Sequence, residues 1–254
     1  MVSLAGKAFV LTGGGSGIGL ATARVLASRG ASLYVGDVNA AALEASLPSI
    51  IHTATAAASI KTSSLDVRNR TDVREFMKKA KAEFGRLHGA ANIAGVTGKG
   101  MGVSKTWELD TDEYEFVMAV NARGVFNCLA EQLRPGVLPE GSSIVNMASV
   151  NSFKALDCAS PYVASKHAVV GLTKTAALEA GPRDIRVNGV APGTVETPML
   201  RKFMEQPDCS FKISTPIARP AQAEEVGRLV AFLLSDDSTF ITGATYSIDG
   251  GWTV

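Results

Sequence analysis

The chain has 254 residues and a net charge of +1; 46% of its residues are apolar and 25 are glycine. This length suits one well-buried α/β domain spanning 1–254, and the balanced charge gives no reason to expect a nucleic-acid or membrane partner. The three cysteines are widely spaced, with no CxxC pair, and the three histidines lack metal-ligand spacing. These patterns argue against a disulfide framework and against a metal site.

No apolar segment approaches the length of a transmembrane helix, and the first residues lack the charged region of a secretory signal. We therefore expect a cytoplasmic protein.

Short apolar segments alternate with helical patterns along the whole chain. Strands are expected at 8–11, 32–36, 60–66, 88–94, 142–148, 185–191 and 244–249, and helices at 17–29, 39–47, 69–84, 111–134, 161–180 and 223–235. The segment 60–66 is polar enough to lie toward a sheet edge. The alternation predicts a Rossmann-type, doubly wound parallel sheet of about seven strands with helices on both faces. Ligands of such a sheet bind beyond the carboxyl ends of the strands.

The first expected strand runs into the glycine-rich turn TGGGSGIG at 12–19. A strand, a glycine turn and a helix start together favour an anion site, because backbone N–H groups face the ligand and glycine permits close approach. The strict GxGxxG spacing is absent, so the turn by itself is a weak indication of a nucleotide. Its candidate phosphate-binding residues are Gly13, Ser16, Gly17, Ile18 and Gly19.

Asp37 closes the second expected strand and strengthens the nucleotide interpretation. A carboxylate there can accept both ribose hydroxyls and would repel a 2′-phosphate, while Ser16, Val38 and Asn39 offer no basic side chain. The sequence therefore predicts NAD(H) in preference to NADP(H), with Val38 beside the adenosine. The alternative is that Asp37 only caps the next helix.

Later strand ends supply further candidates for cofactor binding. Asp66 and Val67 follow the third strand, where a side chain could reach the adenine. The fourth strand ends in NIAG, which contributes Asn92, Ala94 and Gly95.

Tyr162 and Lys166 lie four residues apart in an expected helix and so share one face. A phenol with a pKa of about 10 is a poor base at neutral pH, and a nearby cation would lower that pKa. We therefore expect an acid/base pair, although the two side chains could simply pack together.

These motifs, taken in order, resemble the short-chain dehydrogenase/reductase family. The resemblance covers essentially the whole chain and rests on TGGGSGIG, NIAG, VNARGVF (120–126), Ser149, YVASK (162–166), VAPGTVET (190–197) and ITGATYSIDGG. It implies an NAD-dependent enzyme that interconverts a secondary alcohol and a ketone. It also implies a homotetramer, or a homodimer, assembled through the helices 111–134 and 161–180.

The resemblance assigns the roles of single residues. Tyr162 would exchange a proton with the substrate oxygen, and Ser149 would hydrogen-bond that oxygen. Lys166 would bind the nicotinamide ribose and lower the pKa of Tyr162, while Asn121 would hold a water that links Lys166 to solvent. The nicotinamide would be lined by Pro192, Gly193, Val195 and Thr197.

The substrate is expected under a lid at about 194–218. Met199, Leu200, Phe203, Met204, Phe211 and Ile213 give that segment an apolar side. An apolar lid suits a bulky alicyclic, steroid-like or terpenoid alcohol or ketone, although these side chains could serve only to pack the lid. Past Ser149, the side chains of Asn151 and Phe153 are expected to face the pocket. The alternatives are a non-redox lyase or cyclase, or an NAD(H)-binding sensor, on the same fold.

Overall fold

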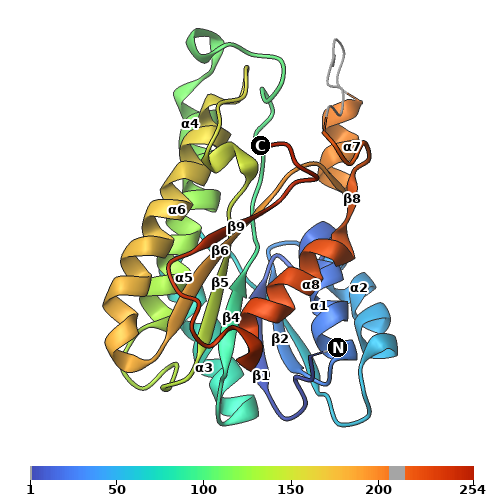
Figure 1. Cartoon of the computed structure of the whole chain (residues 1–254), viewed down its shortest axis with the longest axis vertical. Helices are drawn as coiled ribbons and strands as arrows, with labels where there is room; N and C mark the ends of the chain where they lie inside the picture. The colour runs from blue at the N-terminus through green and yellow to red at the C-terminus, as the bar shows by residue number, and fades with distance from the viewer. Residues whose placement is uncertain (1, 206–214) are drawn as a thin grey trace.

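The structure is a computed structural model that describes residues 2–205 and 215–254. A seven-stranded, fully parallel sheet forms its centre, in the order β3-β2-β1-β4-β5-β6-β9 (Figure 1). The strands are β1 Ala8–Thr12, β2 Ser32–Asp37, β3 Ile60–Ser64, β4 Gly89–Asn92, β5 Ser143–Met147, β6 Arg186–Pro192 and β9 Thr245–Ile248. The polar strand β3 lies at the edge, as its composition predicts. The strand order reverses between β1 and β4, which creates the crevice typical of this fold.

Helices cover both faces of the sheet. They are α1 Gly17–Ser28, α2 Ala40–Thr53, α3 Arg70–Phe84, α4 Thr111–Met118, α5 Gly124–Gln132, α6 Ser160–Ala180 and α8 Ala223–Leu234. Helices α1, α2 and α8 pack together on one face, and α3, α5 and α6 pack on the other (Figure 1). The predicted Rossmann-type fold is confirmed. No helix in the described part of the chain is long and apolar enough to cross a membrane.

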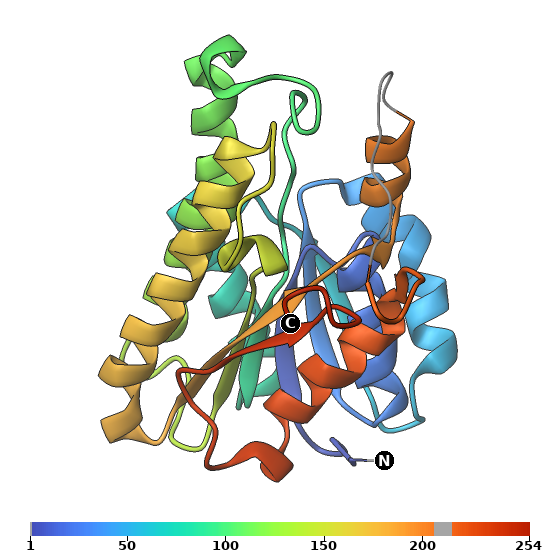
Figure 2. The same cartoon turned by 45° about the horizontal axis from the view of Figure 1, so that its top comes forward.

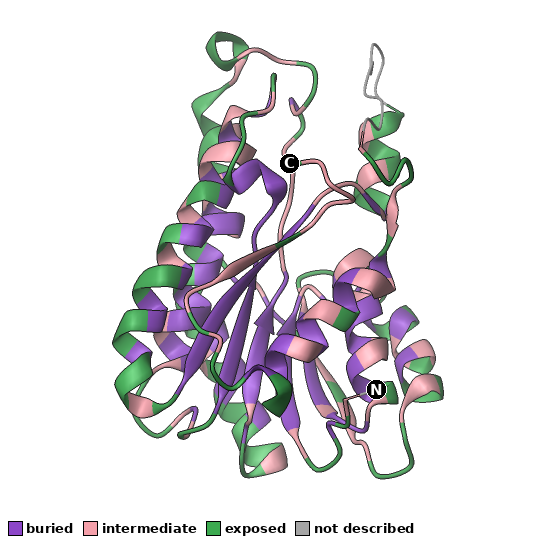
Figure 3. Cartoon of the chain, in the orientation of Figure 1, coloured by how far each residue is buried: buried purple, intermediate pink, exposed green. Residues whose placement is uncertain are grey.

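The core consists of two apolar layers separated by the sheet, and the pleat of the strands explains them. Along β1, Phe9 and Leu11 point into the layer under α1 and α8, while Ala8 and Val10 point into the layer under α3, α5 and α6. The inner strands of the sheet are largely buried, the edge strands β3 and β9 are partly exposed, and the outer faces of the helices are exposed (Figure 3). Because both faces are covered, the inner strands are mainly apolar on both faces rather than alternating, whereas the edge strand β3 is polar.

Two expected helices differ from the sequence prediction. The helix expected at 39–47 continues to Thr53 and contains Pro48, because Ile50 beyond the proline is fully buried in the core. The helix expected at 111–134 is interrupted by a π-helical turn, Ala119–Arg123, between α4 and α5. Such turns occur frequently at functional sites, and this one carries Asn121.

The expected lid begins with strand β7, Val195–Glu196, and helix α7, Pro198–Met204, and returns to β8, Ala221–Gln222. With the top of the molecule turned forward, α7 and α4 rise on opposite sides beyond the carboxyl ends of the strands (Figure 2). One of the three cysteines, Cys209, and the expected lid residues Phe211 and Ile213 lie outside the described residues.

Candidate active site

A cavity of about 550 Å³ opens at the carboxyl ends of the strands, where the strand order reverses. The glycine turn, the ends of β2, β4, β5 and β6, helix α6 and the C-terminal segment all contribute to its wall. Most of the predicted site residues line it: Gly13, Ser16, Gly17, Ile18, Gly19, Asp37, Val38, Asp66, Val67, Ala94, Gly95, Ser149, Asn151, Tyr162, Lys166, Pro192, Gly193, Val195, Thr197, Met199 and Phe203.

The glycine turn is shaped by close backbone contacts. Gly13 has a φ of +76°, and a Cβ atom there would lie 2.7 Å from the backbone of Ala94. A Cβ atom on Gly19 would overlap the carbonyl of Gly13. Ser16 precedes α1 but its side chain makes no capping hydrogen bond, so the first N–H groups of α1 stay available at the cavity wall.

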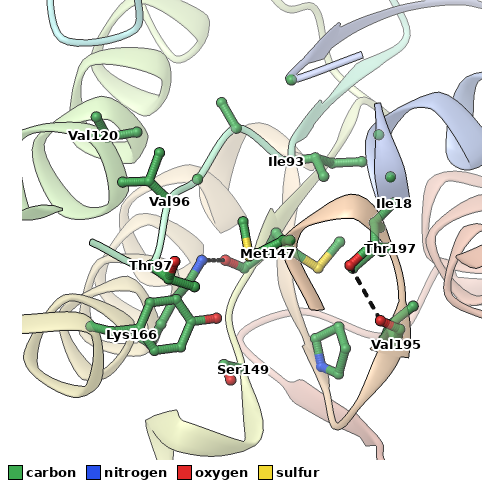
Figure 4. A pocket seen from close by; sticks show the side chains of 18 of the residues that line it. Ile18, Ile93, Val96, Thr97, Val120, Met147, Ser149, Lys166, Val195 and Thr197 are labelled. Atoms are coloured by element: carbon green, nitrogen blue, oxygen red, sulfur yellow. Dashed lines mark hydrogen bonds between the residues drawn. The ribbon is translucent and has the colours of Figure 1, made fainter. Parts of the chain in front are cut away.

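Thr197 brings the segment after β6 against the glycine turn. A Cβ atom on Gly17 would lie 3.4 Å from the Thr197 methyl group. The Thr197 hydroxyl donates to the Val195 carbonyl at 3.2 Å and accepts from the Leu200 N–H at 3.2 Å, which fixes the start of α7 (Figure 4).

Asp37 holds the turn and the start of α2 together. One carboxylate oxygen accepts from the Gly15 N–H and the other from the Asn39 N–H, each at 2.9 Å. The cap of α2 is Asn39, whose side chain accepts from the Ala42 N–H, so capping does not account for Asp37. Each carboxylate oxygen has a second lone pair, and Asp37 lines the cavity.

Asp66 and Val67 form the neighbouring wall. The Arg68 guanidinium donates to Asp66 at 2.6 Å, and this hydrogen bond holds the pKa of Asp66 below its ordinary value. Asn127 donates to the Val67 carbonyl at 2.9 Å and fixes that loop on α5.

Lys166 is almost fully buried, with 3% of its surface exposed. Its Nζ donates to the carbonyl oxygen of Met147 at 2.8 Å, at the end of β5 (Figure 4). The same nitrogen lies 5.6 Å from the centroid of the Tyr162 ring. Burial lowers the pKa of Lys166 to about 8, because water no longer solvates the charge.

The pKa of Tyr162 moves in the direction opposite to the sequence prediction. Burial raises this pKa, and a hydrogen bond with the Ser149 side chain opposes the rise. The Lys166 ammonium group is directed to the Met147 carbonyl and is itself desolvated. In this structure burial outweighs the hydrogen bond, and the lowering of the Tyr162 pKa by Lys166 stays a prediction.

Comparison with known proteins bears on the identity of this site. The family model described as Enoyl-(Acyl carrier protein) reductase matches residues 13–253. The Short-chain dehydrogenase/reductase ABA4 of Pyricularia oryzae is 42% identical, over 99% of this chain and 94% of its own length. The chain belongs to the short-chain dehydrogenase/reductase family. This family uses a nicotinamide cofactor, and its members are oxidoreductases.

Two further relatives of this short-chain dehydrogenase/reductase carry more specific names. Cyclohexanol dehydrogenase of Acinetobacter sp. strain SE19 is 39% identical over 97% of this chain and 95% of its own. Levodione reductase of Leifsonia aquatica is 38% identical over 96% of this chain and 93% of its own. A crystal structure of levodione reductase superposes with a TM-score of 0.91, at 37% identity, and covers 97% of both chains.

Asn121 lies behind the cavity wall of this short-chain dehydrogenase/reductase rather than in it. Its amide oxygen accepts from the Val96 N–H at 2.8 Å, and its amide nitrogen donates to the Val96 carbonyl at 2.8 Å and to Ser165 at 3.0 Å. A Cβ atom on Gly95 would lie 3.2 Å from the Asn121 oxygen and 3.5 Å from Lys166 Nζ. Asn121 and Lys166 thus face the same glycine, and the water-holding role of Asn121 stays a prediction.

The structure does not bring Asn92 or Phe153 to the cavity wall. Asn92 is buried and donates to Gln132 at 3.0 Å and to Asn146 at 2.9 Å, so it ties β4 to α5 and β5. The Phe153 side chain is directed outward, with 48% of the residue exposed.

Sequence reasoning missed several apolar residues that line the cavity: Met101, Phe116, Leu156 and Trp252. Phe116 comes from helix α4, whereas Met101, Leu156 and Trp252 come from loops and from the C-terminal segment, where no strand or helix periodicity indicates direction. It also missed Ser152, whose hydroxyl accepts from the Ser149 N–H at 3.2 Å and donates to the Lys166 carbonyl at 2.8 Å.

Proposed function

We propose that the protein is an NAD-dependent oxidoreductase that interconverts a secondary alcohol and a ketone on an alicyclic substrate. The observation that carries this proposal is the convergence of Tyr162, Ser149 and Lys166 on one cavity whose other end holds the glycine turn and Asp37. Tyr162 is the proton donor, Ser149 the hydrogen-bond donor and Lys166 the cation, and all three lie at one end of a dinucleotide-sized crevice.

The chemistry at Tyr162 follows from its surroundings. Because burial raises the pKa of the phenol, it is protonated at neutral pH and ready to donate to a ketone oxygen. The Ser149 hydroxyl hydrogen-bonds the same oxygen and positions it. For alcohol oxidation the phenol must give up its proton first, which a charged Lys166 favours and a neutral Lys166 does not.

The cavity fits a nicotinamide dinucleotide. The uncapped start of α1 suits the diphosphate, and Asp37 can accept the ribose hydroxyls with its remaining lone pairs. When bound, the nicotinamide supplies or accepts the hydride. The preference for NAD rests on Asp37, whose charge repels a 2′-phosphate.

The substrate class rests on the cavity wall and on the relatives. Met101, Leu156, Met199, Phe203 and Trp252 form a wall suited to a ring of low polarity. Cyclohexanol dehydrogenase, levodione reductase and a 2,5-dichloro-2,5-cyclohexadiene-1,4-diol dehydrogenase are named for six-membered ring compounds.

A direct test measures nicotinamide reduction with NAD and with NADP across cyclic and acyclic secondary alcohols. Turnover of ring alcohols with NAD supports the proposal. Product formed without a change in nicotinamide absorbance would point to a lyase or cyclase. Tight NADH binding without turnover of any alcohol or ketone would point to a sensor.

We also propose a homotetramer in the cytoplasm. The exposed apolar side chains Phe126 on α5 and Leu178 on α6 support assembly through these helices. A mass measurement in solution tests the assembly, and subcellular fractionation tests the location.

A further inference from the structure

Asn151 contributes a polar side chain to a cavity wall that also carries the apolar residues Met101, Leu156, Met199 and Phe203. The residue is 6% exposed and lines the cavity two residues beyond Ser149. Within residues 2–205 and 215–254, its side-chain amide makes no hydrogen bond; the only bond at this residue is the donation of its backbone N–H to the Ser149 hydroxyl at 3.2 Å. Buried amides normally find partners, so an unpaired one calls for an explanation.

The amide of Asn151 is not sealed inside the protein. The hydroxyls of Thr22, Ser142 and Thr245 are fully enclosed without a partner, whereas the Asn151 atoms are not among these enclosed atoms. Since the residue lines the cavity, the space that its amide reaches is the cavity itself. A ligand in the cavity can therefore supply the missing hydrogen bonds.

The position of Asn151 is fixed relative to the reacting groups. It lies in the 3-10 turn Val150–Ser152, whose first N–H groups bond to the Ser149 side chain. The Ser152 hydroxyl ties this turn to the Lys166 carbonyl of α6 at 2.8 Å. A substrate oxygen held by Ser149 and Tyr162 thus places the rest of a small ring beside Asn151.

From this arrangement we infer that the substrate is an alicyclic alcohol or ketone with a second oxygen function on the ring, and that Asn151 binds that second oxygen. An amide both donates and accepts, so it matches either a hydroxyl or a carbonyl group. A ring without a second oxygen would displace water from the amide and leave it unpaired. Sites of this kind discriminate strongly against analogues that lack the matching group. The inference rests on the proposed oxidoreductase function and narrows its substrate class.

The test compares cyclohexanol with cyclohexane-1,2-diol, -1,3-diol and -1,4-diol under NAD. For the wild type, kcat/KM for at least one diol should exceed that for cyclohexanol by about tenfold or more, beyond the statistical advantage of two equivalent hydroxyls. In Asn151→Leu, whose side chain has the same number and branching of heavy atoms but no polar atoms, this ratio should fall to near one while cyclohexanol is still oxidised.

Thr97→Val is the matched control. Thr97 also lines the cavity, but its hydroxyl already donates to the Gly98 carbonyl at 3.3 Å, so its removal should leave the diol-to-cyclohexanol ratio unchanged. Asn151→Ala is a second variant in case leucine disturbs folding, which thermal unfolding would reveal.

The outcomes separate this inference from the proposed function. A wild type that oxidises cyclohexanol and the diols equally well overturns the inference and leaves the oxidoreductase function intact. An unchanged ratio in Asn151→Leu, with only the KM for NAD raised, assigns Asn151 to the cofactor and also overturns it. Failure to oxidise any of the four alcohols and to reduce the matching ketones removes the proposed function, and the inference falls with it.

Discussion

Lys166 Nζ lies 2.8 Å from the carbonyl oxygen of Met147, so the buried ammonium of helix α6 is fastened to the end of strand β5. The four-residue spacing on the helix places the ammonium group 5.6 Å from the centroid of the Tyr162 ring. The bond to Met147 holds the ammonium group in that position. The two groups share a helix face, but the lysine is directed to the sheet rather than to the tyrosine hydroxyl. The proton chemistry of the site therefore depends on burial as much as on the pairing of the two side chains.

Replacing Tyr162 by phenylalanine should lower kcat/KM by about a hundredfold to ten-thousandfold, the usual contribution of a general acid or base. The ring and its packing stay, so the affinity for NADH should change little. Steady-state kinetics and NADH fluorescence titration measure the two effects. Substantial remaining turnover in this variant would contradict the role given to Tyr162.

Lys166→Met should change how stability depends on pH. The pKa of Lys166 is about 8 in the folded protein against 10.5 for an ordinary lysine. Between these values the unfolded chain binds more protons, so the lysine makes the folded state more stable as pH rises from about 8 to 10.5 and costs stability below 8. This cost is at most about 3 kcal/mol. Near neutral pH, the free energy of unfolding of the variant should therefore exceed that of the wild type.

Urea unfolding of both proteins from pH 7 to pH 10.5 tests this prediction, because the difference between them isolates Lys166 from other titrating groups. The advantage of the variant should shrink as pH rises. A difference that stays constant across that range would contradict the lowered pKa of Lys166.

Asp37→Ala should erode the preference for NAD. Hydrogen bonds to a charged group contribute about 1.5–3 kcal/mol, so kcat/KM for NAD should fall by about tenfold to more than a hundredfold. The value for NADP should fall less or rise, since the repulsive charge is gone. Asp37→Asn is the matched control, because it keeps an acceptor for the Gly15 N–H and removes the charge. A wild type that prefers NADP would refute the role of Asp37.

Glu131→Gln should make the protein less stable at neutral pH and less sensitive to acid. The Glu131 side chain is 1% exposed and pairs with Arg70, Arg74 and Arg134. Burial alone would raise its pKa, but hydrogen bonds from Arg74 and Arg70 bring it to about 2. Its stabilising contribution is therefore complete above pH 4.5 and is lost as pH falls from there toward 2.

Unfolding of the wild type and Glu131→Gln at neutral pH and near pH 3 measures this effect. The stability difference should be about 1–3 kcal/mol at neutral pH and smaller in acid. Equal stability at both pH values would show that the arginine cluster contributes nothing to the fold.

The alternation of apolar strands with helical patterns was sufficient to predict the Rossmann-type sheet, including β3 at its edge. Short-range rules were enough here, because strands buried on both faces must be continuously apolar and each crossover needs a helix. The lining of the cavity by the glycine turn and Asp37 was also predictable from the sequence, since the glycine turn directly follows β1 and Asp37 ends β2, both at the carboxyl edge of the sheet.

Only the tertiary structure decided the surroundings of the reacting groups. The spacing of Tyr162 and Lys166 places them on one face, but whether the ammonium is directed to the phenol depends on the Met147 carbonyl of a different element. The raised pKa of Tyr162 results from burial by residues distant in sequence. The unpaired amide of Asn151 and the wall formed by Trp252 likewise arise from packing between separate segments, because no local periodicity determines where a loop side chain points.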